Sequence, residues 1–193
     1  MISPWCDVRM LTANINGINL NGNQTVESLV VSYDLVCLQK TKLSDTTHSS
    51  KVLYRVLRQC RHRCFYSYFQ PLDSLIITHP RAGVMAILSS RFPGASSAHI
   101  ISTRTITGRY LVIVTQAGNV TYFLYNVYAP CGSQEKMEFY TALAGQCYSG
   151  GARHMILGDF NLPHEVSISS RSSDSVSTKY FNRWLASLGL DDD

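Results

Sequence analysis

Strand-like and helix-like segments alternate along almost the whole chain, and no linker-like stretch interrupts them before a serine-rich segment at 166–178. Residues 7–13 and 34–39 have the apolar character of strands. Between them, apolar residues recur at helical spacing after Thr25, a residue type that caps helices. The chain therefore opens with a predicted strand–helix–strand unit.

The middle of the chain is rich in strand patterns. Five further segments have strand character: 65–69, 83–88, 98–103, 109–116 and 119–128. The last two are joined by Gln116-Ala-Gly-Asn119, whose residues suit a hairpin turn. Long antiparallel hairpins among helices predict a layered α/β domain with sheets inside and helices outside.

The C-terminal part alternates in the same way. A helix pattern follows Ser133 and closes at Gly150-Gly151, and a short strand at 154–157 comes next. After the polar serine-rich loop, the last helix is expected over 178–188. We therefore expect one domain spanning residues 1–193.

The composition agrees with a single domain and indicates the cellular compartment. The chain has 193 residues, 45% hydrophobic and 16% charged, enough for a sizeable core in one domain. It contains no apolar run of roughly 18 residues and no secretory signal pattern, which favours a soluble protein without a membrane partner. Six cysteines in such a chain predict reduced thiols, and hence the cytoplasm or nucleus.

Basic residues are concentrated between positions 51 and 64, where no acidic residue occurs. Lys51, Arg55 and Arg58 fall on one side of a helix pattern and apolar residues fall on the other. This pattern predicts an amphipathic helix with a cationic outer face. Two interpretations remain open: a solvated surface, or contact with a phosphate backbone.

Short polar clusters follow four of the predicted strands, where layered α/β proteins assemble their sites. Each alone is typical of an ordinary turn or of packing. The four are Asn14–Gly17, Gln39–Lys42, Tyr125–Pro130 and Gly158–Asn161. Carboxylate and amide oxygens suit a hard cation, while amide and phenol groups can donate hydrogen bonds to a phosphate.

In order and spacing, these clusters resemble the endonuclease/exonuclease/phosphatase superfamily, and in particular the apurinic-endonuclease-like domains of non-LTR retrotransposons. The resemblance implies a four-layer α/β sandwich, with two packed mixed sheets flanked by helices. It also implies Mg²⁺-dependent hydrolysis of phosphodiesters by a nuclease that nicks DNA, with no small-molecule cofactor. Any association with a reverse transcriptase is implied by the resemblance alone. The motifs that carry it are 14–18, 36–39, 83–87, 126–130 and 157–163.

The resemblance also assigns roles to residues. Asn14 would help to hold the nucleophile or the metal shell, and Tyr128 would contact the scissile phosphate. Asp159 would bind the metal and orient or deprotonate the attacking water. Asn161 would bind a phosphate oxygen.

The chain departs from the family pattern at three places. Lys40 occupies the position of the glutamate that is the family's main metal ligand, and a lysine cannot ligate Mg²⁺. Its charge opposes a cation by on the order of 4 kcal/mol per unit charge at about 4 Å. Cys131 stands where the nuclease branch has an asparagine, and the closing motifs with the acid/base histidine have no counterpart, so we expect the last strands to be absent.

Two functions follow from these observations. The first is a metal-dependent endonuclease whose remaining site is formed by Asn14, Tyr128, Asp159 and Asn161. The second is a degenerate, non-catalytic fragment that at most binds nucleic acid. A third reading, hydrolysis of phosphoinositides or other small phosphodiesters, is disfavoured by the retroelement-like motifs. Nucleic acid would be contacted by Lys40, Lys42, Arg55 and Arg58.

Overall fold

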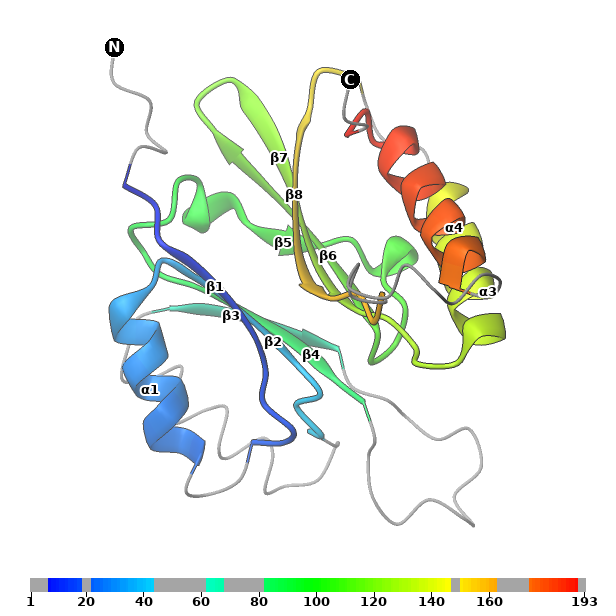
Figure 1. Ribbon diagram of the computed structural model, residues 1–193. Coiled ribbons are helices and arrows are strands. Elements are labelled where there is room, and N and C mark those ends of the chain that lie inside the picture. Colours follow the sequence, from blue (N-terminus) through cyan, green and yellow to red (C-terminus); the bar gives the residue numbers. More distant parts are fainter. Residues whose placement is uncertain are drawn as a thin grey trace.

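Two mixed four-stranded sheets face each other at the centre of the protein (Figure 1). In this computed structural model the described residues are 7–18, 22–43, 62–67, 82–146, 150–162 and 174–190. The first sheet has the order β1 (Met10–Asn14), β2 (Leu35–Gln39), β4 (Val84–Leu88), β3 (Arg63–Ser67). The second has the order β5 (His99–Ile100), β6 (Tyr110–Ala117), β7 (Val120–Tyr128), β8 (Arg153–Asp159).

Each sheet combines one parallel pair with antiparallel pairs. β1 runs parallel to β2, and β7 runs parallel to β8. The other neighbours are antiparallel, and the longest ladder is the β6–β7 hairpin, which pairs Tyr110 with Val127 and Ala117 with Val120. Because both parallel pairs end at the same edge of the sandwich, four strand ends come close together there.

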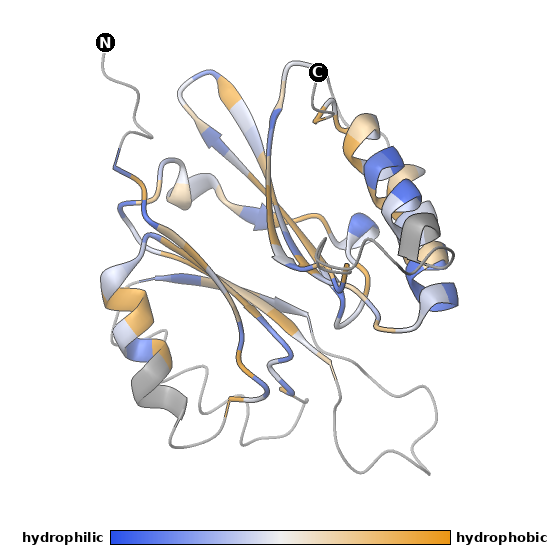
Figure 2. Cartoon of the chain, in the orientation of Figure 1, coloured by the Kyte–Doolittle hydropathy of each residue, from blue (hydrophilic) through white to orange (hydrophobic). Residues whose placement is uncertain are grey.

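The inner faces of the two sheets share one hydrophobic core. Alternation along β2 turns Leu35 and Cys37 toward the second sheet, where they join Leu111 and Leu124. Figure 2 shows hydrophobic residues running along the middle of the strands in both sheets. Burial in this core raises the pKa of the Cys37 thiol to about 12.

Helices cover the two outer faces, which completes four layers (Figure 1). α1 (Gly22–Ser32) packs Val26 and Val30 against the outer face of the first sheet. α3 (Ser133–Ala144) and α4 (Asp174–Ser187) pack against the second sheet through an aromatic cluster. The cluster includes Tyr110, Tyr125, Phe139, Tyr140 and Trp184. The predicted four-layer α/β sandwich of two mixed sheets is therefore confirmed.

Several local predictions are wrong. The segment 98–103 forms only the two-residue β5, because residues 102–104 turn into a 3-10 helix (Ser102–Arg104). Thr25 lies inside α1 rather than at its start. The helix after Ser133 ends at Ala144, before Gly150-Gly151, and α4 begins at Asp174, inside the segment predicted as a loop. The residues of the predicted basic helix, 51–60, lie outside the described part of the chain.

Candidate functional site

The site is built where the carboxyl ends of four strands meet. Asn14 at the end of β1 is the register partner of Gln39 at the end of β2. Tyr128 at the end of β7 is the register partner of Asp159 at the end of β8. Strand alternation turns all four side chains toward the space between the sheets. The structure thus places three of the four predicted catalytic residues at one edge of the sandwich.

A direct hydrogen bond between the two sheets defines this edge. The Asn14 Nδ2 group donates to Asp159 Oδ2 over 2.7 Å, and the two residues are 145 positions apart in the chain. The other carboxylate oxygen, Oδ1, accepts the backbone N–H of Asn161 at 3.1 Å. Asp159 is half-buried and Asn14 is exposed, so solvent reaches the pair. These two hydrogen bonds fix the orientation of the carboxylate.

Asn161 is the fourth predicted residue, and its backbone is held in the left-handed region with φ of 47°. Its Nδ2 group donates to the Ala129 carbonyl at 2.6 Å. The buried ammonium of Lys136 on α3 donates to the Asn161 carbonyl at 2.9 Å. A left-handed asparagine persists only where its surroundings hold it. Here the segment after Tyr128 and helix α3 do so.

Tyr128 is almost fully buried, and its ring is covered by a cation. The Arg109 guanidinium carbon lies 4.7 Å from the ring centroid. Burial raises the pKa of Tyr128, the nearby Asp159 charge adds to that rise, and Arg109 opposes it. The phenol therefore stays protonated at neutral pH and can donate a hydrogen bond to an anion.

A buried polar pair links the sheets just beneath the site. Gln39 Nε2 donates to Asn126 Oδ1 at 2.7 Å. Asn126 Nδ2 in turn donates to the carbonyls of Leu38 and Met85, at 3.2 and 2.7 Å. A buried amide without a hydrogen-bond partner would lower the free energy of unfolding. The network therefore fixes the relative position of the two sheets beneath the strand-end site.

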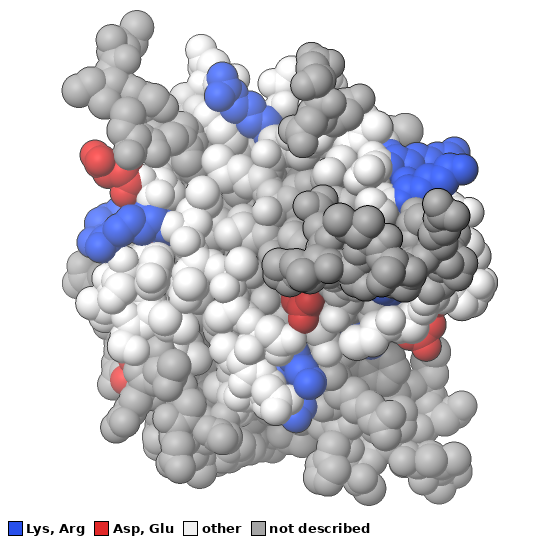
Figure 3. Space-filling model, viewed as in Figure 1, with Lys and Arg blue, Asp and Glu red and all other residues white. Residues whose placement is uncertain are grey.

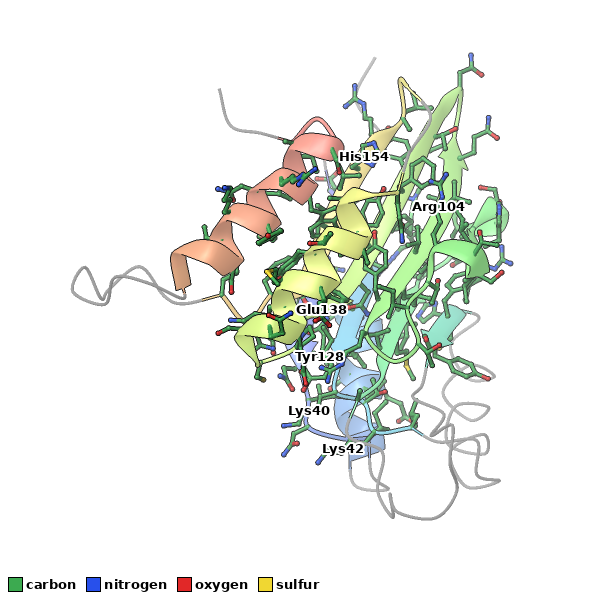
Figure 4. All side chains as sticks on the ribbon, turned by 90° about the vertical axis from the view of Figure 1, so that its right-hand side faces the viewer. Lys40, Lys42, Arg104, Tyr128, Glu138 and His154 are labelled. Carbon is green, nitrogen blue, oxygen red and sulfur yellow. The ribbon has the colours of Figure 1, made fainter. Side chains whose placement is uncertain are left out.

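Lys40 and Lys42 follow β2 in left-handed conformations, with φ of 55° and 53°. Between them, Thr41 is buried, and its backbone donates to Gly83 at 3.1 Å and accepts from Ile18 at 2.9 Å. Figure 4 places Lys40, Lys42 and Tyr128 at the same end of the sandwich. Both lysines therefore lie at the edge occupied by Asn14 and Asp159.

The donor set does not fit the magnesium ion that the family pattern implies. The described residues contain no group of three His, Cys, Asp or Glu side chains that could hold a metal. Mg²⁺ sites use carboxylates, and within the described ranges Asp159 is the only carboxylate at the carboxyl end of a strand. Its two oxygens already accept hydrogen bonds, and Lys40, at the family's glutamate position after β2, has no acceptor atom to offer a metal.

Two site residues carried no clear sequence signal. Arg109 comes just before β6 and reaches Tyr128 only through the β6–β7 pairing, in which the Tyr128 N–H donates to the Arg109 carbonyl. Lys136 looks like an ordinary exposed helix residue in sequence, yet it is 5% exposed. Of the other predicted contacts, Arg55 and Arg58 lie outside the described residues. Cys131 is an exposed free thiol.

Comparison with known proteins identifies the family. A model of the endonuclease/exonuclease/phosphatase family matches residues 11–175. The chain belongs to this family. Within it, residues 11–175 carry all four predicted catalytic residues and both lysines of the Lys40–Lys42 segment. No curated protein matches the chain in sequence.

Solved structures share the fold of this endonuclease/exonuclease/phosphatase chain. The endonuclease domain of TRAS1, a telomere-specific non-LTR retrotransposon, has a TM-score of 0.58 at 14% identity, covering 96% of this chain and 76% of that one. Humanized D. rerio TDP2 has a TM-score of 0.53 at 15% identity, covering 81% and 67%. D. rerio TDP2 complexed with single-strand DNA product has a TM-score of 0.52 at 15% identity, covering 81% and 62%.

No helix within the described ranges is long and apolar enough to cross a membrane. The solved structures that share the fold include an endonuclease domain and a protein solved with a DNA product.

Proposed function

We propose that this family member binds the phosphodiester backbone of nucleic acid at the strand-end site. The observation that carries the proposal is the hydrogen bond between Asn14 and Asp159, which brings amide and phenol donors from both sheets to one solvent-reached edge. Each amide nitrogen has two N–H groups and uses one of them in the bonds described above. The second N–H of Asn14 and of Asn161, with the Tyr128 hydroxyl, is suited to phosphate oxygens.

Nucleic acid is favoured over small phosphodiesters by two considerations. Among the structures that share the fold, one is a retrotransposon endonuclease domain and another holds a single-strand DNA product. The site also lies at an open edge with an exposed Asn14 and an exposed Lys42, which suits a polymer running past it. We place Arg55 and Arg58 among the backbone contacts as well.

Hydrolysis is the second candidate function, and the oriented carboxylate is the observation that favours it. Asp159 is the register partner of Tyr128, so a base and a phosphate-binding donor stand on neighbouring strands. In this candidate Asp159 takes a proton from the attacking water while Tyr128, Asn14 and Asn161 hold the phosphate. DNA would then be nicked at the strand-end site.

One experiment separates these candidates. Supercoiled plasmid nicking and fluorescence polarisation with a labelled single-stranded DNA are measured together, with magnesium and with chelator. The proteins are wild type, Asp159→Ala, Tyr128→Phe and Lys40→Glu. DNA binding without nicking supports the binding role. Nicking that Asp159→Ala abolishes supports hydrolysis, and wild type that neither binds nor nicks contradicts both.

The proposal also covers the domain organisation and the cellular location of the protein. We propose that residues 1–193 act as one domain and that the protein works in the cytoplasm or the nucleus, where its cysteines stay reduced. Cys37, Cys64 and Cys131 are free thiols. Burial raises the pKa of Cys64 to about 12, so this thiol is unreactive at neutral pH.

A further inference from the structure

Three cationic residues from two parts of the chain lie at the edge of the sandwich that carries the strand-end site (Figure 4). Lys40 and Lys42 follow β2, while Arg109 precedes β6 and lies over Tyr128. Lys40 and Arg109 are half-buried and Lys42 is exposed. Against them stands one strand-end carboxylate, Asp159. The local charge within the described residues is therefore positive, in a place where the family pattern has a glutamate.

The two lysines are fixed by their backbone rather than by side-chain partners. The N–H groups of Thr41 and Lys42 donate to the carbonyls of Gly83 and Ala82, at 3.1 and 3.2 Å. Between the two lysines the Thr41 side chain is buried. A left-handed backbone at both Lys40 and Lys42 is a strained arrangement that the neighbouring strand ends maintain. The backbone positions from which both lysine side chains start are therefore set by the fold before a ligand binds.

Arg109 is held by an aromatic ring and by the sheet. Its guanidinium lies over Tyr128 and hydrogen-bonds to that side chain, which lowers the pKa that burial raises. An arginine that donates to a phenol oxygen leaves the phenol proton available for an anion. Arg109 and Tyr128 are therefore arranged to act together on the same ligand.

Within the described ranges, none of these three cations forms an ion pair with an acidic side chain. Among the described ranges the ion pair found is that of Arg91 with Asp34, at the other end of β2. Figure 3 shows the charged side chains of one face as small separate groups, with an acidic and a basic one adjacent near its centre.

We propose that Lys40, Lys42 and Arg109 form a fixed anion site that binds a phosphate group of nucleic acid without a divalent metal ion. The inference rests on the proposed function, and it specifies how that function is carried out. Where the family pattern bridges protein and phosphate through a metal, the Lys40 ammonium contacts the phosphate directly. Binding then depends on salt and does not require magnesium.

The test is polarisation of a fluorescein-labelled single-stranded DNA, titrated with protein in EDTA and in magnesium. The variants are Lys40→Met, Lys42→Met and Arg109→Met, which keep most of each side chain's length. The matched control is Arg153→Met, because Arg153 begins β8 and so lies at the opposite end of the strand from Asp159. A parallel measurement follows backbone amide NMR shifts on adding inorganic phosphate in EDTA.

The expected result is that binding persists in EDTA and is no stronger in magnesium, because Mg²⁺ competes with the protein's cations for the phosphates. Lys40→Met weakens binding about tenfold, as removal of a charged hydrogen bond does, and lowers the salt dependence by about 0.7 in log–log slope. Arg153→Met leaves both unchanged. Phosphate shifts the amides around Lys40 and Arg109 in the wild type and not in the Lys40→Met variant.

The outcomes separate the two proposals. Binding that requires magnesium overturns the metal-free anion site and leaves the proposed function standing. Phosphate shifts at Lys40 without any DNA binding overturn the proposed function and support the anion site. Absence of both DNA binding and phosphate shifts overturns both. Equal loss in Arg153→Met and Lys40→Met shows nonspecific attraction and also overturns the anion site.

Discussion

Asp34 and Asp159 are two carboxylates at opposite ends of the sandwich, and their surroundings differ. Asp34 precedes β2, and its side chain is 8% exposed. It accepts hydrogen bonds from the Arg9 N–H at 3.1 Å, the Ser89 hydroxyl at 3.1 Å and the Arg91 Nε at 2.9 Å. Asp159 ends β8, is half-buried, and accepts from the Asn14 amide and the Asn161 N–H.

The difference lies in how the negative charge is compensated. Arg91 forms an ion pair with Asp34, whereas the partners of Asp159 are neutral amides. The protein therefore compensates Asp34 entirely within the fold, but it leaves part of the interaction capacity of Asp159 open to solvent. One carboxylate is expected to stabilise the fold and the other to serve a ligand.

The largest expected effect comes from removing each carboxylate in turn. Asp34→Ala leaves the Arg9 N–H and the Ser89 hydroxyl without their acceptor, which costs about 3 kcal/mol of unfolding free energy. Asp159→Ala removes bonds to solvent-reached groups and costs less than about 1 kcal/mol. Urea unfolding followed by circular dichroism measures both. Equal losses at the two positions would refute the contrast.

Lowering the pH tests the same difference between Asp34 and Asp159, with a smaller expected effect on stability. Burial opposes ionisation of Asp34, but its hydrogen bonds from Arg9, Ser89 and Arg91 outweigh burial and hold its pKa below the usual 3.8. The stability that Asp34 contributes is present above its unfolded-state pKa and is lost as pH falls through the lower folded-state pKa. Urea unfolding between pH 5 and pH 2 is expected to show a steeper loss for wild type than for Asp34→Asn. Identical pH profiles would contradict this assignment.

At the end of the sandwich that carries the site, a glycine substitution beside the Lys40–Lys42 segment is expected to affect DNA binding more than stability. Gly83 has φ of 134°, and a Cβ there would collide with the Thr41 hydroxyl and lie 3.3 Å from the Lys42 nitrogen. Gly83→Ala should therefore cost about 1–2 kcal/mol and displace Lys40–Lys42, weakening DNA binding.

Gly118→Ala is the matched control for this substitution. Gly118 also has a positive φ, 61°, but no described atom lies within 4 Å of a Cβ built there. It should lose less stability in urea unfolding than Gly83→Ala, because only the positive φ opposes the new side chain, and it should bind DNA as wild type does. A Gly83→Ala protein that binds DNA normally would show that the position of the lysine segment is unimportant.

The smallest expected effect concerns a single oxygen. Within the described part of the chain, Thr41 Oγ1 is buried and has no hydrogen-bond partner. Thr41→Val keeps the shape and removes the unsatisfied hydroxyl, so thermal unfolding should show a gain of up to about 1 kcal/mol. DNA binding should be unchanged, because both lysines keep their backbone hydrogen bonds. A loss of stability would indicate that the hydroxyl has a partner in the folded protein.

The fold was predictable where local patterns are strong. Turn chemistry and alternation in 109–116 and 119–128 predicted the β6–β7 hairpin to within one residue at each end. The prediction failed where local preference competes with pairing: the apolar segment 98–103 pairs with β6 over two residues only.

The site was predictable only in part, since it depends on contacts between distant segments. Polar clusters after strands indicated Asn14, Asp159 and Asn161, because carboxyl ends of parallel strands meet at one edge. Their roles remain predictions. Arg109 was not predicted, because its contact with Tyr128 arises from the register of the β6–β7 hairpin. Lys136 was not predicted either, because a helical pattern does not reveal which lysine is buried against the segment that contains Asn161.

The hydrogen bond between Asn14 and Asp159 also determines when the strand-end site can form during translation. It closes a loop of 145 residues, so the site does not exist on a nascent chain until β8 has emerged from the ribosome. At about 5–20 residues per second, translation separates the two partners by roughly 7–30 seconds. During that interval the first sheet can form although β8, which carries Asp159, has not yet been synthesised. The proposed phosphate site therefore becomes complete only after β8 has joined the second sheet.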